Sequence, residues 1–407
     1  MKKVVLSYYL LLFSFGHTIG QKKAVFIILD GIPADVVESV DTPTLDEIAK
    51  NGGYSRAYTG GIAGGYSETP TISAVGYNSL LTGTWANKHN VWGNGIKDPT
   101  YNYWNIFRVA KSANPALKTA IFSTWLDNRT KLVGEGLEKA GNVKIDFAFD
   151  GFELDTIRFP HTEDRRYIFN IDELVSKEAG KYILEKGPDL SWVYLEFTDD
   201  MGHRYGDGPE MYDAVEKADI QVKRIWESIK IREKEFGEDW MILITTDHGR
   251  DKTTGKGHGG QSERERTIWM VTNSTKLNKS YYQKPAMVDI MPSLLTHMEI
   301  QIPVEIKKEI DGTSFVGQIS VKDVNATMHG NRLKLNWTNY ADQGSARIFM
   351  SNSNNFKEGG DDSYQEIGKC HLLPATCELD LPPTEIGFLK ILMQVDEEFW
   401  NTWLINK

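Results

Sequence analysis

The chain has 407 residues, of which 40% are hydrophobic and 25% charged, and its formal net charge is −10. This content excludes a disordered or collagen-like chain, since 11 Trp, 17 Tyr and 17 Phe can bury enough surface to offset the entropy of folding. The acidic balance argues against a nucleic acid polymer as partner, because proteins bind such polymers through surfaces rich in lysine and arginine. The length favours one large domain and one smaller domain.

Residues 1–20 read as a secretory signal peptide. Lys2 and Lys3 precede an apolar run over residues 4–16, and small residues surround a cleavage site near Gly20. An N-terminal membrane anchor is the alternative, although the run is shorter than the roughly 20 apolar residues that span a bilayer. We therefore expect a secreted or periplasmic protein with no membrane span after cleavage of the signal.

Buried strands and helices alternate along the next 290 or so residues. The apolar run over 24–29 is typical of a strand covered on both faces, and similar strands are predicted over 119–123, 192–197, 241–245 and 268–271. A helix is predicted over 43–51, with Pro in its first turn and Gly after its end. A long amphipathic helix is predicted from Pro209 to about Glu235. This alternation predicts an α/β domain with a central, mostly parallel sheet covered by helices on both faces.

The pattern changes after Gly312. Short alternating strands, such as 332–338 and 388–395, are separated there by Gly, Asn, Asp and Pro turns, which predicts an all-β sandwich. We place the larger domain over 21–317 and the all-β domain over 318–407. Cys370 and Cys377, the only cysteines, both fall in the second domain. An oxidising compartment favours a disulfide between them over two free thiols.

Acidic and histidine side chains follow several of the predicted strands. They are Asp30, the pair Asp199-Asp200 with His203, the pair Asp247-His248, and His258 within a glycine cluster. Alone, each has a structural explanation, such as a turn or a surface loop. In an open α/β sheet, however, functional groups gather at the carboxyl ends of the strands, and Asp and neutral His are ligands that Zn²⁺ prefers. Together these residues predict a metal centre.

These motifs resemble those of the alkaline phosphatase superfamily and, within that superfamily, those of the nucleotide pyrophosphatase/phosphodiesterase branch. The resemblance covers residues 22–317 and implies an alkaline-phosphatase-like fold for the larger domain. Asp199, His203 and His258 would hold one Zn²⁺, and Asp30, Ser73, Asp247 and His248 would hold the other, with other divalent metals as alternatives. Asp200 rivals Asp199, but the four-residue step to His203 fits the motif better. The smaller domain resembles fibronectin type III at the level of topology only.

The resemblance also implies a nucleophile. Ser73 lies ahead of Thr82-Gly83 at the family spacing and would form a covalent phosphoserine, with Thr71 as its rival. Asn94, 21 residues after Ser73, corresponds to the residue that binds the phosphoryl oxygens in the family.

The expected reaction is hydrolysis of a phosphodiester or pyrophosphate in a small, nucleotide-like substrate. Trp125 favours a diester, because related monoesterases carry Lys and Arg in that loop, although Arg129 and Lys131 are close enough to reopen the question. An alkaline-type phosphomonoesterase is therefore the first alternative. A non-catalytic secreted binding protein on a hydrolase fold is the second, and the filled ligand positions argue against it.

Overall fold

The structure is a computed structural model that describes residues 20–381 and 387–405. Residues 1–19 of the predicted signal peptide lie outside the described residues.

Within the described residues, seven strands form one sheet in the order β2-β7-β6-β1-β5-β3-β4. The strands are β1 (Lys22–Leu29), β2 (Gly53–Tyr58), β3 (Thr119–Ser123), β4 (Phe147–Phe149), β5 (Leu190–Leu195), β6 (Asp239–Thr245) and β7 (Thr267–Thr272). Strands β6, β1, β5, β3 and β4 run parallel, as predicted, whereas β7 is antiparallel to both of its neighbours. The prediction of a mostly parallel sheet is thus confirmed.

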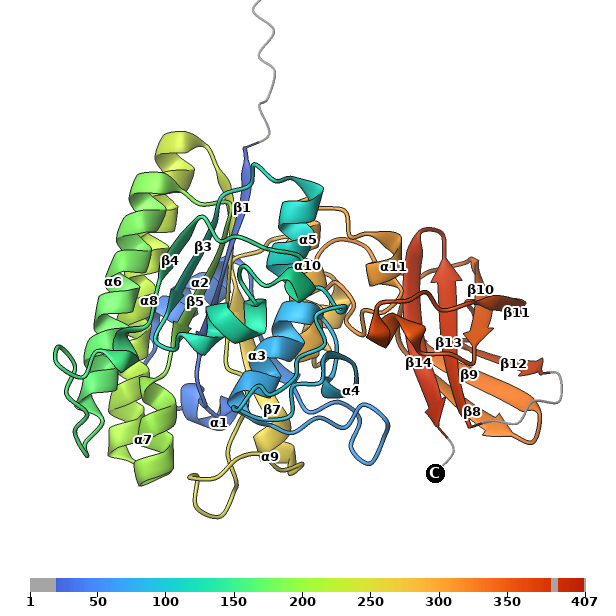
Figure 1. The fold of residues 1–407 in the computed structure, drawn as a ribbon, viewed down its shortest axis with the longest axis horizontal. Helices are drawn as coiled ribbons and strands as arrows, with labels where there is room; N and C mark the ends of the chain where they lie inside the picture. Colours follow the sequence, from blue (N-terminus) through green and yellow to red (C-terminus); the bar gives the residue numbers. More distant parts are fainter. Residues whose placement is uncertain (1–19, 382–386, 406–407) are drawn as a thin grey trace, which may run out of the picture.

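Helices cover both faces of this sheet (Figure 1). The α-helices are α1 (Ala34–Val37), α2 (Pro43–Asn51), α3 (Ser73–Thr82), α4 (Ala86–His89), α5 (Ile106–Ala113), α6 (Arg166–Lys186), α7 (Phe197–Tyr205), α8 (Pro209–Phe236), α9 (Glu263–Arg266), α10 (Ile290–His297) and α11 (Val304–Lys307). Short 3₁₀ or π turns are η1 (Asn128–Val133), η2 (Glu138–Ala140), η3 (Phe152–Leu154), η4 (Lys279–Tyr282), η5 (Met287–Asp289) and η6 (Asn355–Glu358). The predicted helices over 43–51 and from Pro209 correspond to α2 and α8.

Strand β1 shows why the sheet lies at the centre. Ala24, Phe26 and Ile28 point into the core beneath α3, α5 and α10, while the alternate residues of the strand point into the core beneath α6 and α8. Successive side chains of a strand face opposite sides, so a continuous apolar run requires cover on both faces.

One predicted element differs from the structure. The strand expected over 192–197 ends at Leu195, and helix α7 begins at Phe197. Asp199 and His203 therefore lie one turn apart on a helix and not in a surface loop. The helix allows both side chains to reach the same site, because residues i and i+4 share one face.

The C-terminal strands form two sheets that are separate from the central sheet (Figure 1). In the part of the chain that the structure describes, one antiparallel sheet has the order β11-β10-β13-β14 and the other the order β12-β9-β8. The strands are β8 (Val321–His329), β9 (Arg332–Asn339), β10 (Ser345–Ser351), β11 (Gln365–His371), β12 (Thr376–Asp380), β13 (Phe388–Val395) and β14 (Glu398–Ile405). Cys370 and Cys377 form a disulfide. The predicted boundary at residue 318 falls between α11 and β8 and stays a prediction.

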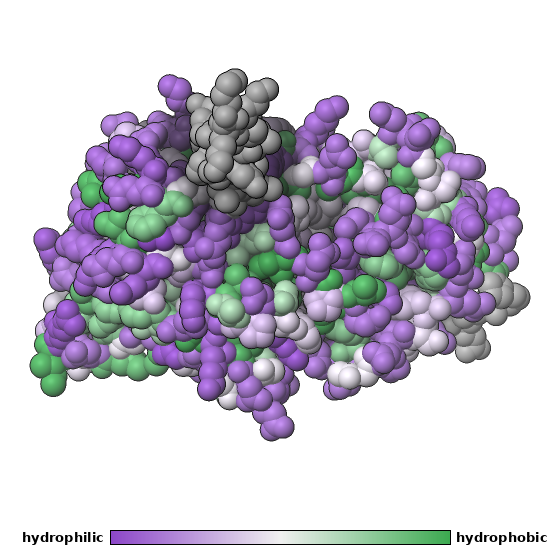
Figure 2. Space-filling model, turned by 90° about the horizontal axis from the view of Figure 1, so that it is seen from above, coloured by the Kyte–Doolittle hydropathy of each residue, from purple (hydrophilic) through white to green (hydrophobic). Residues whose placement is uncertain are grey.

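The surface seen from above in Figure 2 is mostly hydrophilic, with apolar residues in small groups. Among the described helices, none is both long enough and apolar enough to cross a membrane.

Candidate metal centre

The candidate residues follow the carboxyl ends of β1, β5 and β6. Helix α7, which follows β5, lies at the lower left of the larger domain in Figure 1. Strands β1 and β6 pair with Ile28 opposite Thr245. Asp30 and Asp247 each lie two residues further along, so this register brings the two carboxylates to the same level. Helix α7 follows β5, the neighbour of β1 on the other side, and contributes Asp199 and His203.

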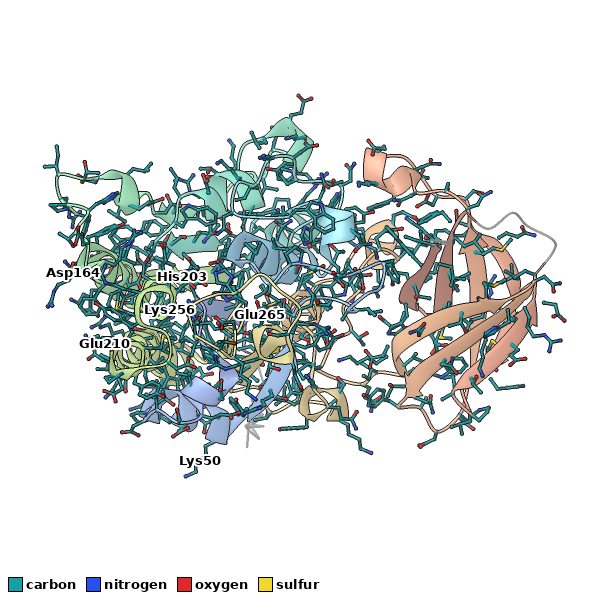
Figure 3. The ribbon with its side chains drawn as sticks, turned by 90° about the horizontal axis from the view of Figure 1, so that it is seen from below. Lys50, Asp164, His203, Glu210, Lys256 and Glu265 are labelled. Carbon is teal, nitrogen blue, oxygen red and sulfur yellow. A yellow bond between two sulfur atoms is a disulfide. The ribbon has the colours of Figure 1, made fainter. Side chains whose placement is uncertain are left out.

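Asp199, His203 and His258 form one group of ligand atoms, all within 4.8 Å of one another. His203 Nε2 lies 3.2 Å from Asp199 Oδ2 and 3.1 Å from His258 Nε2. Figure 3 views this end of the molecule from below and shows His203 beside Lys256 of the loop after β6. His203 is half exposed, so this group opens toward solvent.

The second group is Asp30, Asp199 and His248, again within 4.8 Å. His248 Nε2 is fully buried and faces the carboxylates of Asp30 at 3.6 Å and Asp247 at 3.2 Å. It also lies 3.3 Å from Ser73 Oγ. The carboxylate of Asp199, 4.0 Å from the same nitrogen, thus lies within reach of both groups.

The hydrogen bonds of the histidine rings suit metal binding. His248 Nδ1 donates to Gly249 O at 3.0 Å, and His258 Nδ1 donates to Thr71 O at 2.9 Å. A carbonyl oxygen can only accept, so each ring is protonated on Nδ1 and presents the lone pair of Nε2 to the site. Metal-bound histidines are usually held by a hydrogen bond of this kind.

Buried carboxylate oxygens without hydrogen-bond partners fit a cation-binding site. Among the described residues, Asp30 Oδ1 and Asp247 Oδ2 are buried and make no hydrogen bond. Asp30 Oδ2, by contrast, accepts hydrogen bonds from Tyr77 and Tyr194. Carboxylate oxygens that face a histidine lone pair in a buried space repel it unless a cation lies between them. The donor set, aspartate oxygens and histidine nitrogens, fits divalent zinc.

The pKa shifts agree with this arrangement. Burial raises the pKa of Asp30 well above its usual range, and the charges of Asp247 and Asp199 raise it further. Burial raises the pKa of Asp247 to about 7 and lowers the pKa of His248 well below 6.5. Burial also raises the pKa of Asp199, but the hydrogen bond with His203 and the charge of Arg250 outweigh it and leave a net decrease.

Arg250 is a site residue that the sequence reasoning missed. Its guanidinium is fully buried and donates to the carboxylate and the backbone oxygen of Asp199 and to Gly31 O. A Cβ atom on Gly202 would lie 2.2 Å from Arg250 Nε, so the glycine makes room for this side chain. In the sequence, two features together could have identified Arg250 as a site residue. They are the glycine of the Asp-x-x-Gly-His segment and the position of the arginine directly after Asp247-His248-Gly249.

Ser73 and Thr71 have different surroundings. Ser73 is the first residue of α3, and its hydroxyl faces His248. The Thr71 hydroxyl donates to Gly260 O and accepts from Gly259 N, both at 2.9 Å. Asn94 is exposed and accepts a hydrogen bond from Ala74 N at 3.0 Å, which places it beside the start of α3. Asp200 does not belong to either ligand group and lies 3.6 Å from Arg165.

Arg129 and Lys131, the basic residues that left the choice between a monoester and a diester open, both form ion pairs with carboxylates. Arg129 forms ion pairs with Asp150 at 2.7 Å and Glu135 at 2.5 Å, and Lys131 pairs with Asp127 at 2.7 Å. Trp125 is half buried and packs edge-on against Tyr77, the residue that donates to Asp30.

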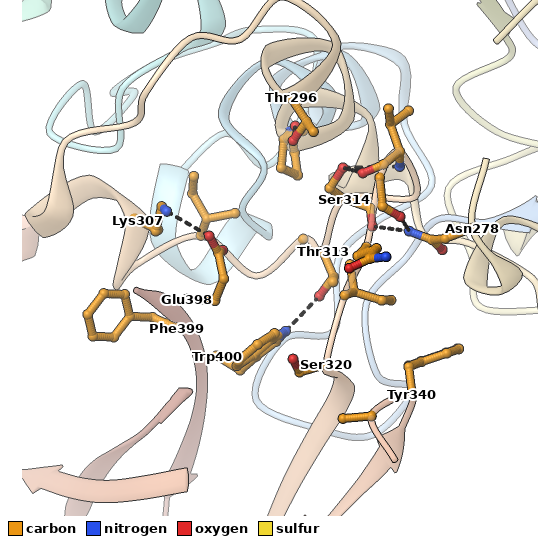
Figure 4. Close-up of a pocket in the computed structure, with 18 of the residues that line it drawn as sticks. Asn278, Thr296, Lys307, Thr313, Ser314, Ser320, Tyr340, Glu398, Phe399 and Trp400 are labelled. Atoms are coloured by element: carbon orange, nitrogen blue, oxygen red, sulfur yellow. Dashed lines mark hydrogen bonds and ion pairs between the residues drawn. The ribbon is translucent and has the colours of Figure 1, made fainter. Parts of the chain in front are cut away.

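A cleft of about 1210 Å³ lies elsewhere, between the larger domain and the β-sandwich. Figure 4 shows Trp400 bonded to Thr313, and Lys307 paired with Glu398, in its wall. None of the candidate metal ligands lines it.

The sequence profile of the type I phosphodiesterase/nucleotide pyrophosphatase family matches residues 24–293. The chain belongs to this family. Human ectonucleotide pyrophosphatase/phosphodiesterase family member 7 is 25% identical over an alignment of 252 residues, and the match covers 58% of this chain and 50% of the relative. Human family member 5 is 24% identical over an alignment of 240 residues, and the match covers 56% of this chain and 45% of the relative. The chain thus spans about half the length of these curated relatives.

A solved structure of a family member has the same fold. An inactive variant of murine ectonucleotide pyrophosphatase/phosphodiesterase 5, in complex with AMP, superposes with a TM-score of 0.51 at 13% identity. The superposition covers 69% of this chain and 96% of the murine chain. The larger domain thus has the alkaline-phosphatase-like fold that the resemblance implied.

Proposed function

We propose that this protein hydrolyses small phosphodiesters or nucleotide pyrophosphates at a two-metal site, with Ser73 as the nucleophile. The observation that carries the proposal is the set of buried, unpartnered carboxylate oxygens around His248 Nε2, beside the Ser73 hydroxyl. Asp199, His203 and His258 would hold one Zn²⁺, and Asp30, Ser73, Asp247 and His248 the other. Bound in this way, two divalent ions would lower the pKa of a serine hydroxyl and stabilise charge on the attacking and leaving oxygens.

Residues of the chain would carry the rest of the reaction. Ser73 Oγ would attack phosphorus, and the bond to the leaving alcohol or phosphate would break on the opposite side. Water would then release the phosphoryl group from Ser73. Asn94 would stabilise a non-bridging oxygen through its Nδ2 amide, because its Oδ1 accepts from Ala74 N and so holds the side chain beside Ser73. Arg250 would hold the Asp199 carboxylate in the orientation in which it faces His203.

The pairing of Arg129 and Lys131 favours a diester over a monoester. A monoester dianion needs additional cationic donors, and both of these side chains already bind carboxylates. Trp125, next to Tyr77, offers an apolar surface for the second substituent of a diester.

We also propose that the protein is exported after cleavage near Gly20, and that residues 318–407 form the second domain.

The test compares kcat/KM for bis(p-nitrophenyl) phosphate and p-nitrophenyl phosphate on the full chain loaded with zinc. We expect the diester to be preferred by about tenfold or more, which corresponds to about 1.4 kcal/mol of transition-state stabilisation. Preference for the monoester by a similar factor would instead establish the phosphomonoesterase alternative. Absence of turnover on either ester and on a nucleotide pyrophosphate would contradict the proposal.

A further inference from the structure

Strand β14 of the β-sandwich contacts two segments that flank the proposed nucleophile. One is the loop before α3, where Tyr66 stacks on Trp403 of β14 with ring centres 5.7 Å apart. The other is α4, which follows α3 and precedes Asn94. Figure 1 shows α4 on the side of the larger domain that faces the sandwich.

Lys88 of α4 connects the two domains. Its side chain is fully buried, and its ammonium donates to Glu309 O at 2.7 Å, Asp311 Oδ1 at 2.5 Å and Asn401 Oδ1 at 2.7 Å. An ammonium has three donors, so all are used. Asn401 belongs to β14, and the ammonium also lies 5.3 Å from the ring centre of Trp403. The β-sandwich thus supplies part of the environment that keeps this buried charge in place.

The position of α4 determines where the following loop begins. Asp311 Oδ2 accepts from Trp85 N at 2.9 Å, which fixes the N-terminal end of α4. His89, the next residue after Lys88, bonds to Ser79 of α3 through Nε2 at 3.0 Å and accepts from Val91 N through Nδ1 at 3.1 Å. The loop then reaches Asn94, which accepts from Ala74 N at the start of α3.

We propose that the β-sandwich contributes to the active site by positioning Asn94. Through Asn401 and Trp403 it holds Lys88, and Lys88 holds α4 so that Asn94 lies against the nucleophile helix. The inference rests on the proposed role of Asn94 in binding the phosphoryl group. Lys88 is a positioning residue, since it does not contact the candidate metal ligands or Ser73.

Lys390 of β13 provides a matched control. It is also fully buried, lies 5.4 Å from the same Trp403 ring, and is bonded to carboxylates, at 2.9 Å to Glu309 and 2.6 Å to Asp362. It makes no contact with α4 among those that the structure gives for the described residues. Loss of Lys390 should therefore weaken the same interface without releasing the Asn94 loop.

The experiment uses the full, zinc-loaded chain and the variants Lys88→Met, Asn401→Ala and Lys390→Met. The thermal midpoint of each variant is measured first. The kcat and KM on bis(p-nitrophenyl) phosphate and the inhibition by orthovanadate are then measured well below that temperature. We expect Lys88→Met to lower kcat and weaken vanadate inhibition by about tenfold to a hundredfold, as for a displaced oxyanion donor. Asn401→Ala removes one of the three acceptors of Lys88 and the hydrogen bond from Asn401 Nδ2 to Ile310 O, and it should act in the same direction if Lys88→Met does not fold. Lys390→Met should lower the thermal midpoint but leave kcat and vanadate inhibition within about twofold of wild type.

Unchanged kcat and vanadate inhibition in Lys88→Met and Asn401→Ala would overturn the inference, as would equal losses in Lys390→Met. Asn94→Ala separates this failure from failure of the proposed function. If Asn94→Ala weakens vanadate inhibition and Lys88→Met does not, only the positioning role fails. If Asn94→Ala has no effect, the proposed role of Asn94 fails, and the inference fails with it.

Discussion

At the scale of single residues, Ser73 and Thr71 show how two neighbouring hydroxyls differ. Thr71 makes two backbone hydrogen bonds to the glycine segment that carries His258. Ser73 instead faces the His248 nitrogen that three carboxylates surround. The contacts of Thr71 are structural, and those of Ser73 suit a nucleophile.

Ser73→Ala should therefore lower kcat by about a thousandfold or more while the protein still binds metal, because the other proposed ligands are intact. Thr71→Val should mainly lower stability, since two hydrogen bonds near His258 are lost. Steady-state kinetics and metal analysis on both variants check this. The assignment of the nucleophile is wrong if Thr71→Val abolishes turnover and Ser73→Ala does not.

The sequence identified residues that the structure brings together, but it missed Arg250. Aspartates and histidines after buried strands stand out, because such positions rarely hold solvated charge. An arginine in the same position reads as a surface residue, and only its four backbone and carboxylate contacts reveal a buried role. Those contacts come from segments far apart in the sequence.

At the scale of elements, strands and helices with long apolar runs or stripes were predictable, whereas short strands that mix small, polar and apolar residues were not. Strands β1, β3 and β6 and helix α8 correspond closely to their predicted ranges. Strand β2, over Gly53–Tyr58, was not predicted, because its buried positions hold Gly, Ser and Ala and carry little hydrophobic signal. The antiparallel direction of β7 depends on the path of the chain after β6, which local patterns do not encode.

Helix α4 leads to a prediction about pH. Burial lowers the pKa of His89 to about 3, and Nδ1 can accept from Val91 only while it is unprotonated. The unfolded chain takes up a proton near pH 6.5, whereas the folded chain stays neutral, so stability is lost as the pH falls from about 6.5 toward 3. This residue should contribute a slope of up to about 1.4 kcal/mol per pH unit.

Urea unfolding of metal-free wild type and His89→Gln at pH 7.5, 5.5 and 4.5 measures this contribution. Metal-free protein is used so that loss of bound ions does not add to the slope. The difference in unfolding free energy between the two proteins should shrink as the pH falls. A difference independent of pH would show that His89 is protonated equally in both states.

At the scale of the whole molecule, the α/β domain followed by a β-sandwich was predictable from the change in pattern after Gly312. The contact between them was not, because Lys88, Asn401 and Trp403 read as unrelated surface or core residues. The wide cleft between the domains was not predictable either, since its walls come from several segments between Asn278 and Trp400.

The proposed two-metal site is tested most directly by the metal content of the full chain after zinc loading and gel filtration. We predict two zinc ions per chain, and one for His203→Ala, which leaves the ligands around His248 intact. His371→Ala, an exposed histidine of β11, should retain both. One ion or none in the wild type, or two in His203→Ala, would contradict the account.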